Sequence, residues 1–242
     1  MLRALNAEDA PRRAVRLHRL PAETGLRLKL YQREGAIVLS DAVPVLENFG
    51  LRALEEVPTA LNHGKLGFIH DFLVALAADT TPEALLARGG AIEESLSAVL
   101  NGQAEDDPFN RLIVAVGLTA TQANWLRAWY RYLRQAGMTF GIITVVDALK
   151  AAPEVTHGLI DLFRARHDPA FAREREDAAQ KAAERIRAGL AAVAAINDDR
   201  LLRAFRAVVE AILRTNAFAP AAAEALALSL IHILTLPTNR EV

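Results

Sequence analysis

The sequence predicts an α+β protein in which a small ferredoxin-like α+β unit precedes a mainly α-helical region. Between residues 26 and 76, strand and helix patterns follow one another in the order strand, helix, strand, strand, which is how a ferredoxin-like unit begins. After residue 82 the strand signal fades, and apolar residues recur at helix spacing to about residue 214. The chain has 242 residues, 52% of them hydrophobic, which is enough for one large or two small domains.

The α+β unit is predicted over residues 26–80. Residues 1–25 are expected to be a polar lead-in, interrupted by Pro11 and Pro21. The segment LRLKLYQ then alternates apolar and polar residues, which is typical of a half-buried strand. The remaining elements of the unit are expected as a turn at 33–35, a helix from an N-cap at Ser40 or Asp41 to Gly50, and strands at 51–57 and 66–76.

The helical region is predicted over residues 81–218. Helices are expected near residues 82–102, 107–116, 120–136, 141–151, 154–166, 173–196 and 198–214. The last of these has the clearest apolar repeat, and Asn197 or Asp198 is its expected N-cap. The charged residues that begin the helix near 173–196 are expected to form an exposed, salt-bridged surface.

The helix predicted within GLTATQANWLRAWYRYLRQAGM (residues 117–138) is rich in aromatic and basic residues. A capping box of Thr119 with Gln122 begins it, and Gly137 ends it. On a helical wheel the aromatic residues share one broad face, and the stripe of Arg127, Arg131 and Arg134 lies opposite. A nucleic-acid surface would mix aromatic and basic side chains. We therefore expect the aromatic residues in the core and the arginines in solvent.

Catalytic and metal-binding signatures are sparse. The sequence contains none of the common dinucleotide, P-loop, nucleophile-elbow or zinc-protease motifs. His70 and Asp71 are adjacent in a predicted strand and should face opposite sides, so a structural role is favoured over a dyad. Gly89-Gly90 is expected to end a helix. We predict no catalytic, cofactor-binding or metal site; the paired carboxylates Glu93-Glu94 and Asp106-Asp107 are interpreted as helix-start charges.

Composition narrows the class of protein further. The net charge of −1 argues against a general binder of polyanions, and we expect no nucleic-acid partner. The absence of cysteine excludes disulfides and thiolate chemistry and fits a reducing, cytoplasmic setting. We see neither a signal peptide nor an apolar run of about 18 residues, so we expect no membrane association.

A series of motifs resembles one family, the large bacterial NAD-specific glutamate dehydrogenases. The residues that carry the resemblance are LRLKLYQREG, LSDAVPVLENFGLRALEE, FIHDF, DPFNRLIVAVGLT, LRAWYRYLRQAG, LFRARHDP and NDDRLLRAFRAVVEAILRTNAF. They follow the family's order and rough spacing over residues 26–218. The segment TFGIITVVDAL and Ala217 depart from the pattern, which makes the chain a divergent member.

The resemblance implies a place within a longer enzyme. In that family, ACT-like regulatory modules and helical motifs precede a catalytic core that binds NAD and oxidatively deaminates L-glutamate. Residues 26–80 resemble the last ACT-like module, and residues 81–218 resemble the helical connector before the core. On this basis the chain is a non-catalytic piece whose partners are the core of the same parent chain and further copies in a homo-oligomer, and NAD belongs to the parent.

A small amino-acid effector is a further implication of the resemblance, because ACT-type modules bind such ligands at a strand-to-helix loop. The matching residues are Gln32, Arg33, Glu34, Gly35 and Ser40. Free N–H groups at the helix start could accept a carboxylate, although Glu34 opposes an anion.

Two alternatives remain open at this point. The chain could be a stand-alone ACT-like sensor, with a helix-turn-helix or partner-binding part, or a module that only mediates oligomerisation. The end of the chain, LSLIHILTLPTNREV, departs from the family pattern and resembles translated sequencing-adaptor sequence. We therefore expect residues 219–242 to be a non-native or disordered tail.

Overall fold

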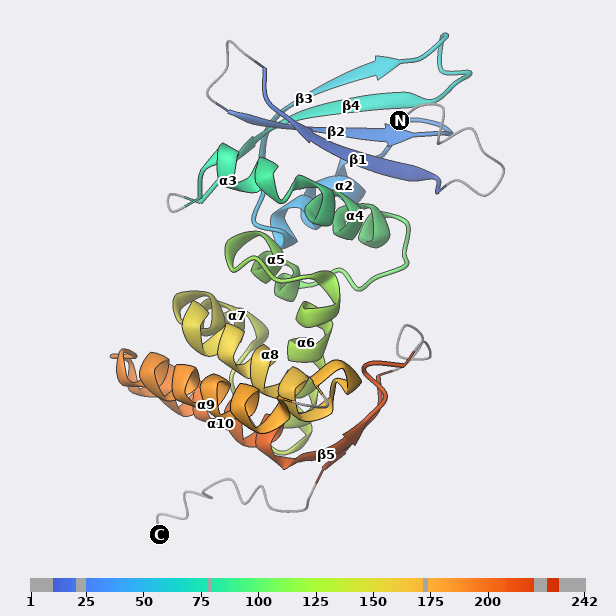
Figure 1. Ribbon diagram of the computed structural model, residues 1–242. Coiled ribbons are helices and arrows are strands. Elements are labelled where there is room, and N and C mark those ends of the chain that lie inside the picture. The colour runs from blue at the N-terminus through green and yellow to red at the C-terminus, as the bar shows by residue number, and fades with distance from the viewer. Residues whose placement is uncertain (1–10, 21–24, 78–79, 172–173, 220–225, 231–242) are drawn as a thin grey trace. The chain divides into compact units, whose positions relative to one another are not determined.

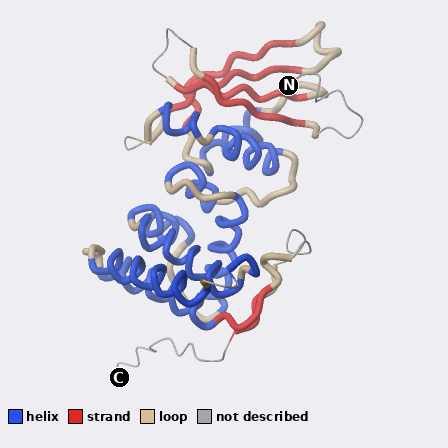
Figure 2. Tube along the Cα trace, in the orientation of Figure 1, coloured by secondary structure: helices blue, strands red, loops and turns tan. Residues whose placement is uncertain are grey.

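The computed structural model describes residues 11–20, 25–77, 80–171, 174–219 and 226–230 (Figure 1). The chain divides into two compact units, Met1–Ala123 and Asn124–Val242. The first unit holds the four-stranded sheet and its helices, and the second is mainly helical (Figure 2). The predicted α+β class and the order of its two parts are confirmed.

The first unit is built as strand, strand, helix, strand, strand, then helices. Its elements are β1 (Arg13–His18), β2 (Leu26–Gln32), α2 (Leu39–Asn48), β3 (Arg52–Ala60), β4 (Phe68–Ala75), α3 (Pro82–Ala87), α4 (Gly89–Leu100), the 3-10 turn η1 (Pro108–Asn110) and α5 (Arg111–Ala115). The sheet order is β1-β2-β4-β3 and every neighbouring pair is antiparallel. The three strands expected from the sequence are therefore present.

Strand β1 was not expected, because it lies within the predicted lead-in. Ala14, Val15 and Leu17 are buried in it, and Leu17 lies opposite Leu28 of β2. The prediction failed because the six residues, which include two arginines, alternate only weakly between apolar and polar. The strand is stabilised by its pairing with β2, which the local sequence does not reveal. The sheet therefore gains its fourth strand from the N-terminal side of the unit, and the element order differs from the usual β-α-β-β-α-β.

The helices of the first unit cover one face of the sheet (Figure 1). Leu28 and Phe72 from the sheet are fully buried there, as are Phe49 beyond α2 and Leu96 of α4. The helices after residue 81 complete this core, and the compact unit that contains the sheet extends to Ala123.

The ends of α2 show which local signals decided the structure. Gly50 has φ +78°, and Leu51 N–H donates to Leu46 while Gly50 N–H donates to Glu47, so the predicted stop is a Schellman motif. The start was predicted incorrectly. Val38 takes the N-cap position without a side-chain bond, and Ser40 lies within the first turn.

Two predicted helices of the first unit are each divided in the structure. The segment 82–102 breaks at Arg88, which lies between α3 and α4, so Gly89 begins a helix and does not end one. The segment 107–116 becomes η1 followed by α5. Asp107 caps Phe109 N–H at 3.0 Å, which confirms its interpretation as a helix-start charge.

The second unit contains helices close to the predicted ranges. Its elements are the greater part of α6 (Ala120–Gln135), α7 (Ile142–Ala151), α8 (Pro153–His167), the 3-10 turn η2 (Pro169–Phe171), α9 (Arg175–Ala191), α10 (Ile196–Ala211), β5 (Ile212–Thr215) and β6 (Leu228–Leu230). Two helices end earlier than expected: α9 at Ala191, and α10 at Ala211, where the chain turns into β5.

The aromatic residues of α6 lie in the core, as expected. Trp125 and Trp129 are buried, and their rings pack against Phe163 of α8 at centroid distances of 4.9 and 5.2 Å. The capping box is also confirmed, because Thr119 and Gln122 exchange hydrogen bonds. Arg127 is an exception to the predicted solvated stripe: it is buried and bonds to Asn124.

A two-stranded sheet of β5 and β6 follows α10. Strand β6 pairs with β5 in antiparallel register, so Leu228–Leu230 forms a short strand within the stretch expected to be a non-native or disordered tail. Residues 220–225 and 231–242 of that predicted tail lie outside the described residues.

Candidate functional site

The predicted effector residues lie in and beside the loop from β2 to α2. The first of them, Gln32, is the last residue of β2, and its buried side chain holds the start of the loop. Its Oε1 accepts a hydrogen bond from Arg13 Nε at 2.9 Å, and its Nε2 donates to the Glu34 carbonyl at 2.8 Å. Only 4% of Gln32 is exposed. Its amide is thus used by the fold, and a ligand would have to compete with Arg13 for it.

The other predicted loop residues are more accessible. Arg33 is half-buried, and its backbone N–H donates to the Arg12 carbonyl at 3.1 Å. Glu34, Gly35 and Ser40 are exposed, and Gly35 has φ +65° with open space where a side chain would lie. A ligand at this loop would therefore meet backbone groups and the Ser40 hydroxyl, beside the acidic Glu34 and Asp41.

His70 of β4 connects this loop to the sheet. Its Nε2 accepts a hydrogen bond from Ile37 N–H at 3.2 Å, and its Nδ1 lies 2.7 Å from Glu56 Oε1 of β3. His70 is 2% exposed. The sequence prediction of a structural role is supported, because both ring nitrogens have partners within the fold and Asp71 lies on the other side of the strand.

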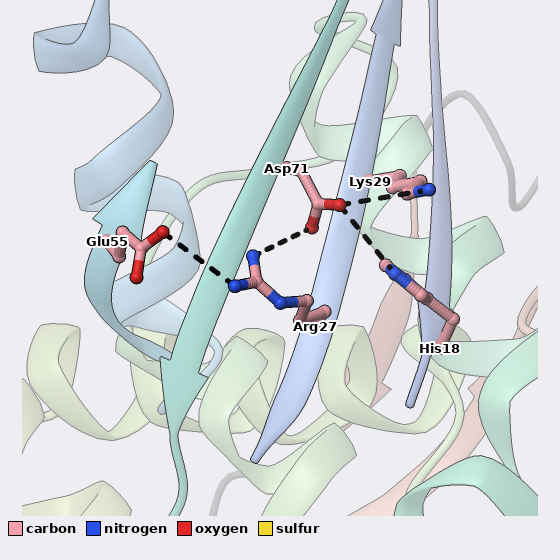
Figure 3. A network of polar contacts seen from close by, with 5 residues as sticks. All are labelled: His18, Arg27, Lys29, Glu55 and Asp71. Atoms are coloured by element: carbon pink, nitrogen blue, oxygen red, sulfur yellow. Dashed lines mark hydrogen bonds and ion pairs between the residues drawn. The ribbon is translucent and has the colours of Figure 1, made fainter. Parts of the chain in front are cut away.

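Asp71 is the centre of an ionic network on the sheet face opposite the helices (Figure 3). Its carboxylate lies 3.4 Å from Arg27 Nη1, 3.8 Å from Lys29 Nζ and 3.7 Å from His18 Nε2. Arg27 also reaches Glu55 of β3 at 3.7 Å. The three basic groups come from β1 and β2, Asp71 comes from β4 and Glu55 from β3, so the network joins all four strands of the sheet.

The phenol of Tyr31 on β2 has a pKa above its ordinary value. Burial raises the pKa of its phenol above 10.0, Asp71 and Glu93 add to the increase, and Arg16 opposes it. The phenol therefore stays protonated at neutral pH, so it can donate a hydrogen bond but cannot serve as a base.

Sequence reasoning missed a row of side chains on α4 that binds the outer edge of β1. Glu93 Oε1 accepts from Leu17 N–H at 2.9 Å, Ser97 Oγ accepts from Val15 N–H at 3.2 Å, and Asn101 Oδ1 accepts from Arg13 N–H at 3.0 Å. The residues are spaced by four on the helix and their partners by two on the strand. Glu93 is thus an edge ligand and not a helix-start charge. The four-residue spacing of Glu93, Ser97 and Asn101 is visible in the sequence. It indicates a row of strand-binding side chains only when the neighbouring strand β1 is known.

The described residues contain no group of three or more His, Asp or Glu side chains that could hold a metal ion. His63 lies in the turn between β3 and β4 with φ +53°, and it is exposed. None of the helices in the described ranges is long and apolar enough to cross a membrane. The side chains described above hold the loop between β2 and α2 and bind the backbone of β1. Most of the other polar side chains described above are paired with one another.

Comparison with known proteins identifies two regions of one enzyme family. Residues 13–85 match the ACT3 domain of glutamate dehydrogenase, and residues 104–169 match its helical motif 3. The first match begins at β1, in agreement with the sheet.

Relatives with similar sequences are called NAD-specific glutamate dehydrogenases. The Pseudomonas aeruginosa protein is 34% identical over 203 residues, or 82% of this chain, and the Halomonas elongata protein is 36% identical over 212 residues, or 86%. The Mycobacterium tuberculosis protein is 35% identical over 191 residues, or 74%. The matched part spans only 12–13% of the length of these relatives.

Proposed function

We propose that this chain, a member of the glutamate dehydrogenase family through its ACT3 and helical motif 3 regions, is a regulatory and scaffolding part of an NAD-specific enzyme. The observation that carries the proposal is the occurrence of both regions in one chain, in series, at 34–36% identity to such enzymes. The whole enzyme would convert L-glutamate, NAD⁺ and water to 2-oxoglutarate, ammonium and NADH with release of a proton.

The division of labour within the enzyme follows from the chemistry of the described residues. His70 and Asp71 are held by partners within the sheet, so we assign hydride transfer and NAD binding to a catalytic core elsewhere in the parent chain. The present segment would pack against that core and against further copies in a cytoplasmic homo-oligomer. As a scaffold it would keep the surfaces between the core and the neighbouring copies in place. A regulatory role requires in addition that it stabilise one state of the enzyme more than another.

A graft into an intact relative tests this assignment. Residues 13–217 would replace the matching region of the Pseudomonas aeruginosa enzyme, and NADH formation from L-glutamate would be followed at 340 nm. Retained NAD-linked activity and the native oligomer are the expected results. A matched graft with Gly67→Ala, which distorts the module, should lose the oligomer. A well-folded graft without activity and without assembly would contradict the assignment.

A small amino acid is the proposed effector, bound at the loop of Gln32, Arg33, Glu34, Gly35 and Ser40. The exposed backbone at Glu34–Gly35 and the exposed Ser40 support this proposal, whereas the engaged Gln32 amide restricts the ligand to the outer part of the loop. Calorimetric titration of the chain with each common amino acid, combined with thermal melting, is the test. Absence of both heat and a melting shift would end the effector proposal and leave the scaffolding role.

A further inference from the structure

His70 is buried between apolar neighbours on the helix-covered face of the sheet. The rings of Phe68 and Phe72, two residues before and after it on β4, lie at centroid distances of 6.2 and 6.5 Å. Leu30 of β2 and Pro58 of β3 are its cross-strand neighbours. An imidazole in such surroundings needs a hydrogen-bond partner for each nitrogen, and both partners are present.

The two partners fix the tautomer of His70. A backbone N–H can only donate, so Nε2, which faces Ile37 N–H at 3.2 Å, must carry a lone pair. A carboxylate accepts, so Nδ1, which faces Glu56 Oε1 at 2.7 Å, must carry the proton. Neutral His70 therefore bridges an edge strand and the loop that leads into α2.

Protonation of His70 would change the two contacts in opposite ways. The Glu56 contact becomes an ion pair, whereas the new proton on Nε2 points at Ile37 N–H and leaves two donors facing each other. Of the charged groups around the ring, Glu56 faces it from β3, Asp71 lies on the opposite side of β4, and Asp41 and Glu34 are exposed on α2 and on the loop. Acid therefore strengthens the contact to β3 and breaks the contact to the loop.

We propose that His70 is a proton-operated positioning residue, whose neutral form holds the Ile37 end of the 33–38 loop against the sheet and whose protonated form releases the Ile37 amide. That the release changes effector binding rests on the proposed function, since the same loop carries Glu34, Gly35 and Ser40. The His70 clamp, as distinct from the contacts of Gln32, requires only the bonds to Ile37 and Glu56.

Nuclear magnetic resonance of the full 242-residue chain tests the clamp. Long-range ¹H–¹⁵N spectra would report the His70 tautomer, and hydrogen exchange would report the protection of the Ile37 amide, between pH 5 and pH 8. We expect the Nδ1–H tautomer at pH 8. As His70 titrates, Ile37 protection should fall about tenfold, the factor for one net hydrogen bond, with the same midpoint as the His70 signals.

Three variants separate the switch from a merely structural role. His70→Gln offers an amide oxygen to Ile37 and an N–H to Glu56, so it should keep the protection and lose its pH dependence. Glu56→Gln keeps an acceptor but removes the charge that favours the imidazolium, so the midpoint should move to lower pH. His63→Gln, in the exposed turn, is the matched control and should leave the Ile37 response unchanged.

Any one of three results would overturn the proposal. The first is an Nε2–H tautomer at pH 8, and the second is an Ile37 response in His70→Gln equal to that of the natural chain. The third is Ile37 protection whose pH dependence follows that of no histidine. Where Glu56→Gln leaves the midpoint in place, the ion-pair step is wrong. Calorimetric titration with each common amino acid at pH 8 and at the low-pH end point distinguishes the two proposals. No heat at either pH with a working clamp rejects the effector and retains the switch.

Discussion

At the scale of the residue, His167 should make the second unit sensitive to acid. Its Nε2 is buried without a hydrogen-bond partner beside Phe163, and burial, with the nearby Arg166 and Arg175, lowers its pKa below 6.5. The unfolded chain therefore binds more protons than the folded chain at pH values from about 6.5 down to the lowered pKa, and the free energy of unfolding should fall as the pH falls through that range. Urea unfolding from pH 5 to pH 8 measures the slope.

His167→Gln should flatten that acid slope, while His63→Gln, which changes an exposed histidine, should leave it as it is. An unchanged slope in His167→Gln would assign the acid sensitivity to other groups, of which His70 is the first to examine.

Gly67 should be among the least replaceable residues of the first unit. It has φ +104°, and a Cβ there would lie against the Gln32 carbonyl oxygen and 3.0 Å from that of Arg33. Gly67→Ala should cost about 2–5 kcal/mol, because backbone strain and the clash add. Gly102 also has a positive φ, +72°, but open space around it, so Gly102→Ala should cost only about 1–2 kcal/mol. Equal losses in thermal or urea unfolding would refute the clash.

At the scale of the element, α4 takes the place of a neighbouring strand along β1. Asn101 makes three contacts: it accepts from Arg13 N–H and donates to the Arg13 and Ser97 carbonyls at 2.8 and 2.6 Å. Asn101→Ala leaves backbone groups of β1 without partners and should cost about 1–3 kcal/mol. Glu94→Ala, on the exposed side of the same helix, should change the free energy of unfolding by less than about 0.5 kcal/mol.

An opened β1 edge should also self-associate, because an unpaired strand edge is a template for another strand. Sedimentation velocity of Ser97→Ala with Asn101→Ala should therefore show larger species than the natural chain. A double variant that stays the same size as Glu94→Ala would indicate that the edge is protected in another way.

At the scale of the whole molecule, local signals were readable from the sequence and distant pairings were not. The stop at Gly50 and the capping box at Thr119 depend on residues within one helical turn, and both are present. Strand β1 depends on partners 9 to 19 residues away along the chain, and the Gln32 side chain on Arg13, which is 19 residues away. The candidate loop was placed correctly between a strand and a helix, but its clamp by His70 spans 33 residues and no periodicity encodes it.

The charge of the whole chain gives the last prediction, which concerns nucleic acid. The net charge is −1, the pI is about 6.6, Arg127 is buried in α6, and Arg134 is bonded to the Met138 carbonyl. Nonspecific DNA affinity comes from cations that neutralise phosphates, and this helix presents too few for that. A fluorescent duplex titrated with micromolar chain in 50 mM salt should show no change in anisotropy, with a basic DNA-binding protein as the positive control. Binding that weakens steeply with added salt would contradict the core assignment of α6 and restore the DNA-binding alternative.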